Sequence, residues 1–164
     1  MKQIVLIATT LLILFAINYN IVKKEAVLRN GKTMLLRLAP VDPRSLMQGD
    51  YMILRYAMAN EIPDELLKNK GCIVVISDKN NVASFLRIHD NNPLKENEHL
   101  LFYRNRNGLR LGAESFFFQE GNAKLYSNAR YGELKVDESG TSVLAGLRGD
   151  DFSSLGTKGI PSIN

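Results

Sequence analysis

The sequence has one cysteine, no tryptophan and two histidines among its 164 residues. A lone cysteine excludes an intramolecular disulfide and a zinc site built from several cysteines. Cys72 opens the apolar run 72–76, which favours a buried structural thiol over a reactive nucleophile. The histidines, His89 and His99, flank the polar segment 90–98 and could meet across it to bind a metal. Without a nearby cysteine or a clear set of carboxylates, we expect exposed loop histidines instead.

Motifs for catalysis and cofactor binding are also missing. The chain contains no HExxH, no GxSxG, no P-loop and no GxGxxG, so we expect neither a metal site nor a cofactor. The formal net charge is only +4, with acids and bases interspersed along the chain. This balance is typical of a solvated surface, and we expect no nucleic-acid binding.

What the sequence does have is a long apolar run, Ile4–Val22. It covers about 19 residues without a charge, close to the roughly 20 that a helix needs to cross a bilayer. A cleaved signal peptide is one alternative, but only poor small-x-small cleavage sites follow the run. A buried helix of a soluble domain is another, but it is unusual for apolar residues to lie on all sides. We predict an uncleaved signal-anchor helix over residues 1–28, which holds the chain in a membrane.

The stretch Pro40–Tyr56 organises the folded part that follows. Its prolines predict a bend, and Asp42 is placed to cap one helical turn over 43–48. Gly49 supplies a backbone conformation that a side chain would hinder, and Asp50 is suited to hydrogen-bond the turn. We expect these residues to shape the chain rather than to carry chemistry.

An alternating strand over 51–58 follows the turn. Alternation places Met52, Leu54 and Tyr56 on one face, and we expect this face in the core. Tyr51 and Arg55 belong to the opposite face.

The rest of the chain reads as short strands with turn signals between them. Strands are predicted over 33–39, 72–77, 82–89, 100–104, 109–111, 133–136 and 141–147, with a strand or helix lead-in over 115–119. Short helices are predicted over 60–70 and 120–130. This pattern indicates a mainly β (α+β) domain over 29–150, built as a curled antiparallel sheet or partly open barrel with two short helices. A flexible tail is expected over 151–164.

The turn and strand match a family signature position for position, at Gly49, Asp50, Tyr51, Leu54 and Tyr56. The chain thereby resembles the GDYXXLXY family of bacterial membrane-anchored proteins. A second block is similar to that family over 116–121, 129–137 and 144–147. The resemblance implies no established activity. It implies a domain outside the cytoplasm that associates with a multi-spanning membrane protein.

The charges beside the apolar run disagree with that orientation. Lys23, Lys24, Arg29 and Lys32 outnumber Lys2, so the positive-inside rule would keep the domain in the cytoplasm. We follow the resemblance and expect a single-pass protein of the bacterial cytoplasmic membrane with an extracytoplasmic domain.

A hydrolase, or an inactive relative of one, is an alternative function. Residues 43–52 look like the segment of type I signal peptidases in which a serine nucleophile precedes a Gly-Asp that opens a strand. Those enzymes also combine an N-terminal helix with a β-rich domain. Here the nucleophile would fall at Pro40 or Val41, which have no hydroxyl, and Ser45 is out of place. Without a nucleophile a Ser–Lys dyad cannot form.

A small-ligand pocket is a further alternative. Glu120, Arg130, Tyr131 and Glu133 concentrate charge near the end of the domain, although a structural ion pair explains the same residues more simply. With Asp42 and Arg55, they are the candidate binding residues.

A basic patch would form if five arginines on or near strands shared a face: Arg55, Arg87, Arg104, Arg106 and Arg110. Such a patch would suit lipid headgroups or an acidic partner. Scattered, solvated arginines are the simpler expectation. The function we expect is a membrane-anchored accessory or interaction domain without catalysis of its own.

Overall fold

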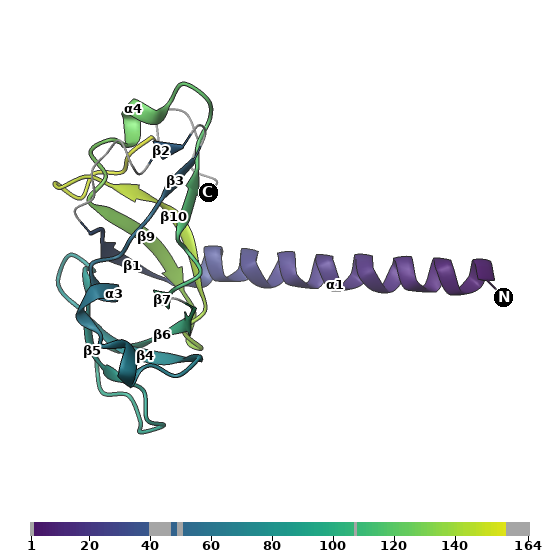
Figure 1. The fold of residues 1–164 in the computed structure, drawn as a ribbon, viewed down its shortest axis with the longest axis horizontal. Coiled ribbons are helices and arrows are strands. Elements are labelled where there is room, and N and C mark those ends of the chain that lie inside the picture. Colours follow the sequence, from purple (N-terminus) through teal and green to yellow (C-terminus); the bar gives the residue numbers. More distant parts are fainter. Residues whose placement is uncertain (1, 40–46, 49–50, 107, 157–164) are drawn as a thin grey trace.

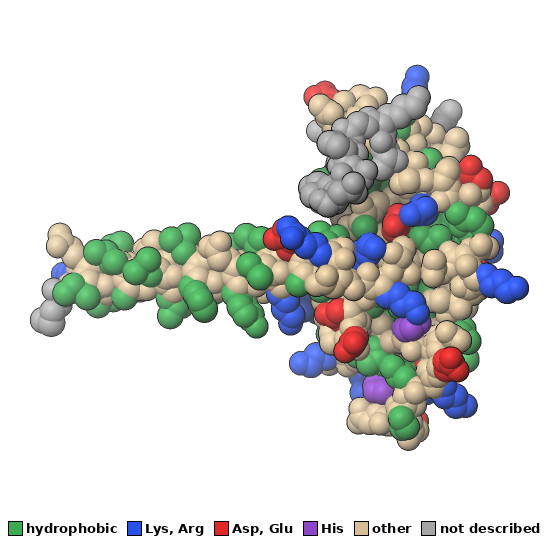
Figure 2. Space-filling model, turned by 180° about the vertical axis from the view of Figure 1, so that it is seen from behind, with side chains coloured by type: hydrophobic (Ala, Val, Ile, Leu, Met, Phe, Trp, Pro, Cys, Tyr) green, Lys and Arg blue, Asp and Glu red, His purple; other side chains and the backbone are tan. Residues whose placement is uncertain are grey.

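The structure is a computed structural model that describes residues 2–39, 47–48, 51–106 and 108–156. A single helix, α1 (Lys2–Asn30), projects from a body of strands (Figure 1). The side chains of Ile4–Val22 are exposed on all sides, and Figure 2 shows them as an apolar rod. The helix is long and apolar enough to span a membrane. It therefore fits the predicted span.

The junction between the helix and the body is tight. α1 ends at Asn30, and β1 (Lys32–Arg37) begins after a single intervening residue, Gly31. The Gly31 N–H donates to the Val27 carbonyl over 2.8 Å. A Cβ at Gly31 would lie 3.0 Å from the Val136 nitrogen, so the helix and the sheet approach too closely for a side chain here. Val27 itself is 4% exposed. The last turns of α1 are therefore part of the folded body.

In the part of the chain that the structure describes, the strands form three antiparallel sheets (Figure 1). One sheet has the order β1-β9-β10, with β9 (Tyr131–Val136) and β10 (Ser142–Arg148). A second has the order β2-β3-β8, with β2 (Met47–Gln48), β3 (Tyr51–Ile53) and β8 (Ser115–Phe117). The third has the order β5-β4-β6-β7, with β4 (Lys70–Ser77), β5 (Ala83–Ile88), β6 (Glu98–Asn105) and β7 (Leu109–Arg110). The predicted mainly β class is confirmed, but the described strands do not close into a barrel.

The core lies between these sheets. Leu36, Leu134 and Leu147 of the first sheet cluster with Ile73 and Leu101 of the third. The first and third sheets also meet at their edges, where the Leu35 N–H donates to the Asn81 carbonyl over 2.8 Å. The sheets therefore pack as one body around shared apolar side chains.

Two predicted helices are much shorter in the structure. The first is α3 (Met58–Glu61) followed by a 3₁₀ turn, Asp64–Leu66. They are separated at Pro63, because the residue before a proline is biased away from the helical conformation and Ile62 is extended. The second is a single turn, α4 (Ala123–Tyr126). Gly121 precedes it with φ of 83°, which delays the helix start.

The strand predicted over 51–58 is also too long, because β3 ends at Ile53. Beyond it the Leu54 N–H donates to the Glu114 carbonyl, and Tyr56 forms only an isolated bridge with Leu38. The predicted alternation nevertheless holds, since Met52, Leu54 and Tyr56 are all buried. The helical turn predicted over 43–48 is wrong at its end, where Met47–Gln48 pairs with β3 as a strand. Its earlier residues lie outside the described part.

Candidate functional site

The described signature residues serve the core. Leu54 and Tyr56 are 2% and 3% exposed. The Tyr56 hydroxyl donates to the Ala113 carbonyl over 2.6 Å. Burial, and then the nearby Glu114 carboxylate, raise the pKa of Tyr56, so the hydroxyl stays a donor. The Tyr51 ring packs against Phe117 with centroids 5.7 Å apart. The signature positions Gly49 and Asp50, like the candidate Asp42, lie outside the described residues.

The polar candidates near the end of the domain do not converge. Glu120 and Arg130 are both exposed, and no ion pair joins them in the described structure. Tyr131 is buried, and its ring packs against Phe152 with centroids 5.2 Å apart. Glu133 accepts a hydrogen bond from Arg148 Nε over 2.8 Å. Tyr131 and Glu133 are thus engaged inside the body.

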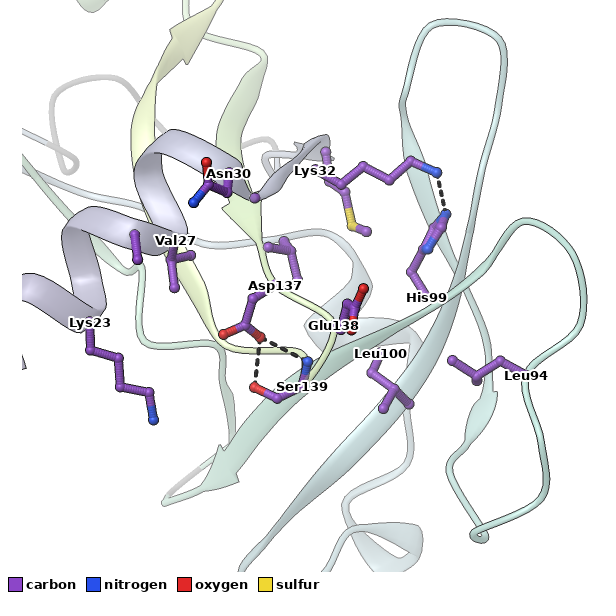
Figure 3. A pocket seen from close by; sticks show the side chains of 14 residues that line it. Lys23, Val27, Asn30, Lys32, Leu94, His99, Leu100, Asp137, Glu138 and Ser139 are labelled. Atoms are coloured by element: carbon purple, nitrogen blue, oxygen red, sulfur yellow. Dashed lines mark hydrogen bonds between the residues drawn. The ribbon is translucent and has the colours of Figure 1, made fainter.

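A hollow lies elsewhere, beside the foot of α1 (Figure 3). It measures about 920 Å³ and opens between the end of the helix, the start of β1, β6 and the β9–β10 turn. Apolar side chains form much of its wall, among them Val27, Met34, Leu94, Leu100 and Val136. Its rim is charged. Lys23, the first residue after the apolar run of α1, belongs to it, so this hollow lies on the side of the body that faces the helix.

A lysine and a histidine meet at the rim of this apolar hollow. Lys32 Nζ lies 2.7 Å from His99 Nε2 (Figure 3). An ammonium group can only donate, so His99 accepts through Nε2 and is neutral. Partial burial, and then the charge of Lys32, lower the pKa of His99. The opposite rim is the β9–β10 turn, where Asp137 accepts hydrogen bonds from the backbone N–H and hydroxyl of Ser139.

A second hollow, which we call the basic hollow, lies beside the same helix end. It measures about 470 Å³ and is lined by Lys24, Phe102, Arg104, Arg106, Arg110, Leu111, Gly112, Glu114, Thr141 and Ser142. Three of the five arginines considered from the sequence therefore line one hollow. Lys24 joins them from α1, with its Nζ 3.5 Å from the Ser142 carbonyl. Figure 2 shows basic side chains gathering around the foot of the helix.

The two remaining arginines do not join this group. Arg87 forms ion pairs of 3.0 Å with both Asp90 and Glu98. Hydrogen bonds from backbone N–H groups, and then the Arg87 charge, lower the pKa values of both carboxyls. Arg55 is exposed on the face opposite the buried Leu54 and Tyr56. The five arginines therefore divide among three places.

The histidines and the cysteine lie on or directly after strands of the third sheet. Among the described residues, no group of three or more His, Cys, Asp or Glu side chains could hold a metal ion. His99 contacts Lys32 instead of His89. Cys72 is partly buried on β4, and burial raises the pKa of its thiol, which disfavours the reactive thiolate.

The sequence pointed to only part of this arrangement. It singled out Arg104, Arg106 and Arg110, but Lys24 was considered only for its charge at the end of the apolar run. His99 is predicted to be an exposed loop residue, whereas it lies on β6 beside Lys32. Lys24 could have been identified from the sequence, because it lies two residues after the end of the predicted membrane span and so belongs at the membrane boundary.

A family model described as GDYXXLXY protein matches residues 13–147 of the chain. No curated protein and no solved structure matches.

Proposed function

The chain belongs to the GDYXXLXY family, and we propose that it is a membrane-anchored accessory domain that works by associating with a membrane protein. In this proposal the chain catalyses no reaction, and the β-rich body lies outside the cytoplasm of a bacterial cell. Resemblance to the family supports the orientation and the kind of partner.

The observation that carries the proposal is the short junction between α1 and the body, where one residue separates the helix from β1. Val27 is buried in the body, and Val22 ends the apolar run. At 1.5 Å per residue these positions are about 7.5 Å apart along the helix. The headgroup layer is about 5 to 7 Å thick on each side of a bilayer. With the apolar run in the hydrocarbon, the body rests at the membrane surface, and no flexible linker lets it leave. A junction of this kind suits a domain whose partner is in the same membrane.

Polar side chains in the apolar run add support for a partner there. Asn18 and Asn20 bond through their amide nitrogens to the Leu14 and Ala16 carbonyls of their own helix, over 2.8 and 2.7 Å. Their amide oxygens have no partner among the described residues. Asparagine side chains in a membrane are stabilised when they hydrogen-bond across to another helix.

Capture from the native membrane tests the proposal. The tagged full-length chain is solubilised in mild detergent and isolated with whatever membrane protein it holds. The same sample is treated with a fluorophosphonate serine probe. We expect a multi-spanning membrane protein to co-purify, and we expect no labelling of the chain.

Matched variants sharpen this test. N18L/N20L removes both amides, whereas I17L/I21L changes the same stretch of helix without changing its polarity. We expect the first pair to weaken capture and the second to leave it unchanged. Failure of the native chain to retain any membrane protein, or labelling of the chain by the probe, would overturn the proposal.

The orientation needs its own measurement. Protease added to intact cells whose outer layers have been removed should digest the β-rich body if it lies outside the cytoplasmic membrane. Protection of the body until the membrane is lysed would contradict the proposed side.

A further inference from the structure

The basic hollow lies between α1 and the β6–β7 hairpin. We propose that it binds the phosphate of an anionic lipid headgroup in the membrane that α1 enters. This inference goes beyond the accessory role, because it requires no protein partner.

The height of the basic hollow above the membrane favours a lipid. Lys24 follows Val22, the end of the apolar run, by two residues, or about 3 Å of helix. Its side chain lines the hollow together with the β6–β7 hairpin. The hollow therefore begins where the hydrocarbon ends, within the layer that holds the lipid phosphates.

The charges in the basic hollow are left uncompensated within the chain. Arg104 and Arg110 stand directly opposite each other on β6 and β7. Like charges in such a position destabilise a sheet unless a counter-charge is present. Yet no acidic side chain of a described residue lies within ion-pair distance of Arg104, Arg106 or Arg110, and all three are exposed.

The one carboxylate that lines the basic hollow is hydrogen-bonded to the backbone and forms no ion pair with the arginines. Glu114 accepts hydrogen bonds from the backbone N–H groups of Leu111 and Gly112. One lining carboxylate against four lining cations leaves the hollow strongly positive. A phosphate is a counter-charge that suits these arginines, because two of its oxygens can accept from the paired donors of a guanidinium.

An acidic protein would satisfy the same charges, but the position of the hollow selects the lipid. Lipid headgroups surround α1 where it leaves the membrane, so they lie next to the hollow already. An acidic protein would first have to bind there. A cation close to an anionic membrane surface strengthens binding about fivefold. Three arginines together should therefore give a preference for anionic over zwitterionic lipid of about a hundredfold.

The test uses the full-length chain in nanodiscs, either of phosphatidylcholine alone or of phosphatidylcholine mixed with phosphatidylglycerol. Hydrogen–deuterium exchange reports on residues 104–111, and native mass spectrometry counts the lipids retained on the chain. We expect slower exchange in this hairpin, and preferential retention of phosphatidylglycerol, when the anionic lipid is present.

Three variants, each with three substitutions, distinguish the effect of the basic hollow from the effect of the overall charge of the chain. R104Q/R106Q/R110Q should abolish both effects. R55Q/K79Q/R130Q removes the same charge from exposed positions that do not line the hollow, and it should keep them. R104K/R106K/R110K should keep most of the lipid preference, because the charge remains. A thermal melt of each variant confirms folding, which we expect because all of these side chains are exposed.

Several results would overturn the proposal. Equal exchange in the two kinds of nanodisc would do so, as would equal losses in the two glutamine variants. Protection in phosphatidylcholine nanodiscs on adding inorganic phosphate alone would assign the hollow to a free anion. Loss of a co-purifying protein in R104Q/R106Q/R110Q without any change in lipid preference would assign it to an acidic partner.

Discussion

The ring of Tyr56 packs against the backbone of Gly132, and a Cβ at Gly132 would lie 3.0 Å from Tyr56 Cε1. Tyr56 is the last residue of the signature that begins at Gly49, and Gly132 belongs to the second block that resembles the family. The two blocks are far apart in the sequence but share one contact in the core. The described part of the signature is thus explained by packing.

We predict that Gly132→Ala destabilises the protein by about 1–3 kcal/mol, the usual cost of overpacking a core. The Tyr56 ring cannot give way, because it is buried and its hydroxyl is held by the Ala113 carbonyl. Thermal melting of the full-length chain in detergent measures the effect. Gly146→Ala on β10 is the control, since the nearest atom to its Cβ would be 3.9 Å away. Equal melting temperatures for the two variants would refute the packing account.

We predict that His99 titrates below its ordinary pKa and that Lys32→Gln raises it. The folded state favours neutral His99, so the unfolded chain binds the proton more readily. Its contribution to stability is therefore present above the unfolded pKa of about 6.5 and is lost as the pH falls through the lower folded value. NMR titration of the ring measures the pKa directly.

Melting curves at different pH values test whether the Lys32–His99 contact affects the stability of the protein. The decline in melting temperature between neutral and mildly acidic pH should be shallower in His99→Gln than in the native chain. If the two chains lose stability in parallel, the Lys32–His99 contact does not set the pH dependence.

We predict that Glu133→Ala costs about 1–3 kcal/mol, because it leaves the Arg148 guanidinium without its charged acceptor. The side chains of this pair are only 13% and 29% exposed. Arg148 also donates to the Phe152 carbonyl, so we expect faster hydrogen exchange in residues 149–156. Glu25→Ala breaks an ion pair whose members are 52% and 75% exposed, and it should change stability by less than about 0.5 kcal/mol. Similar costs for both variants would show that burial does not strengthen the Glu133 pair.

We predict that Cys72 reacts slowly with iodoacetamide at neutral pH and that Cys72→Ser retains any co-purifying partner. Its raised pKa keeps little thiolate present. Labelling followed by mass spectrometry compares the folded chain with the chain in denaturant. Equal rates in the two states would show that the fold does not protect the thiol.

The hairpins were predictable because their signals are local. In the Asp78–Asn81 turn, for example, the Asp78 carboxylate accepts from the N–H groups of Asn80 and Val82. The division into three sheets was not predictable, because it depends on pairings such as Tyr51 with Phe117. The pattern of apolar residues within each of these two strands does not indicate which strand it pairs with.

The basic hollow could not be predicted from the sequence either, because it also depends on contacts between distant segments. The basic hollow needs Lys24 of α1 beside Arg104 and Arg110 of a distant hairpin. The sequence identified the arginines and the helix end separately. Only the packing of α1 against β9 and β10 brings them together.

A flexible junction between α1 and the body tests most directly whether the body must be held at the membrane surface. A flexible Gly-Ser spacer is inserted between Lys23 and Lys24, and the capture of membrane protein is compared with that of the native chain. We expect the native chain to retain a membrane protein and the spacer chain, although still folded and membrane-bound, to lose most of it. Equal retention by the two chains would contradict the claim that the body must be held at the membrane surface.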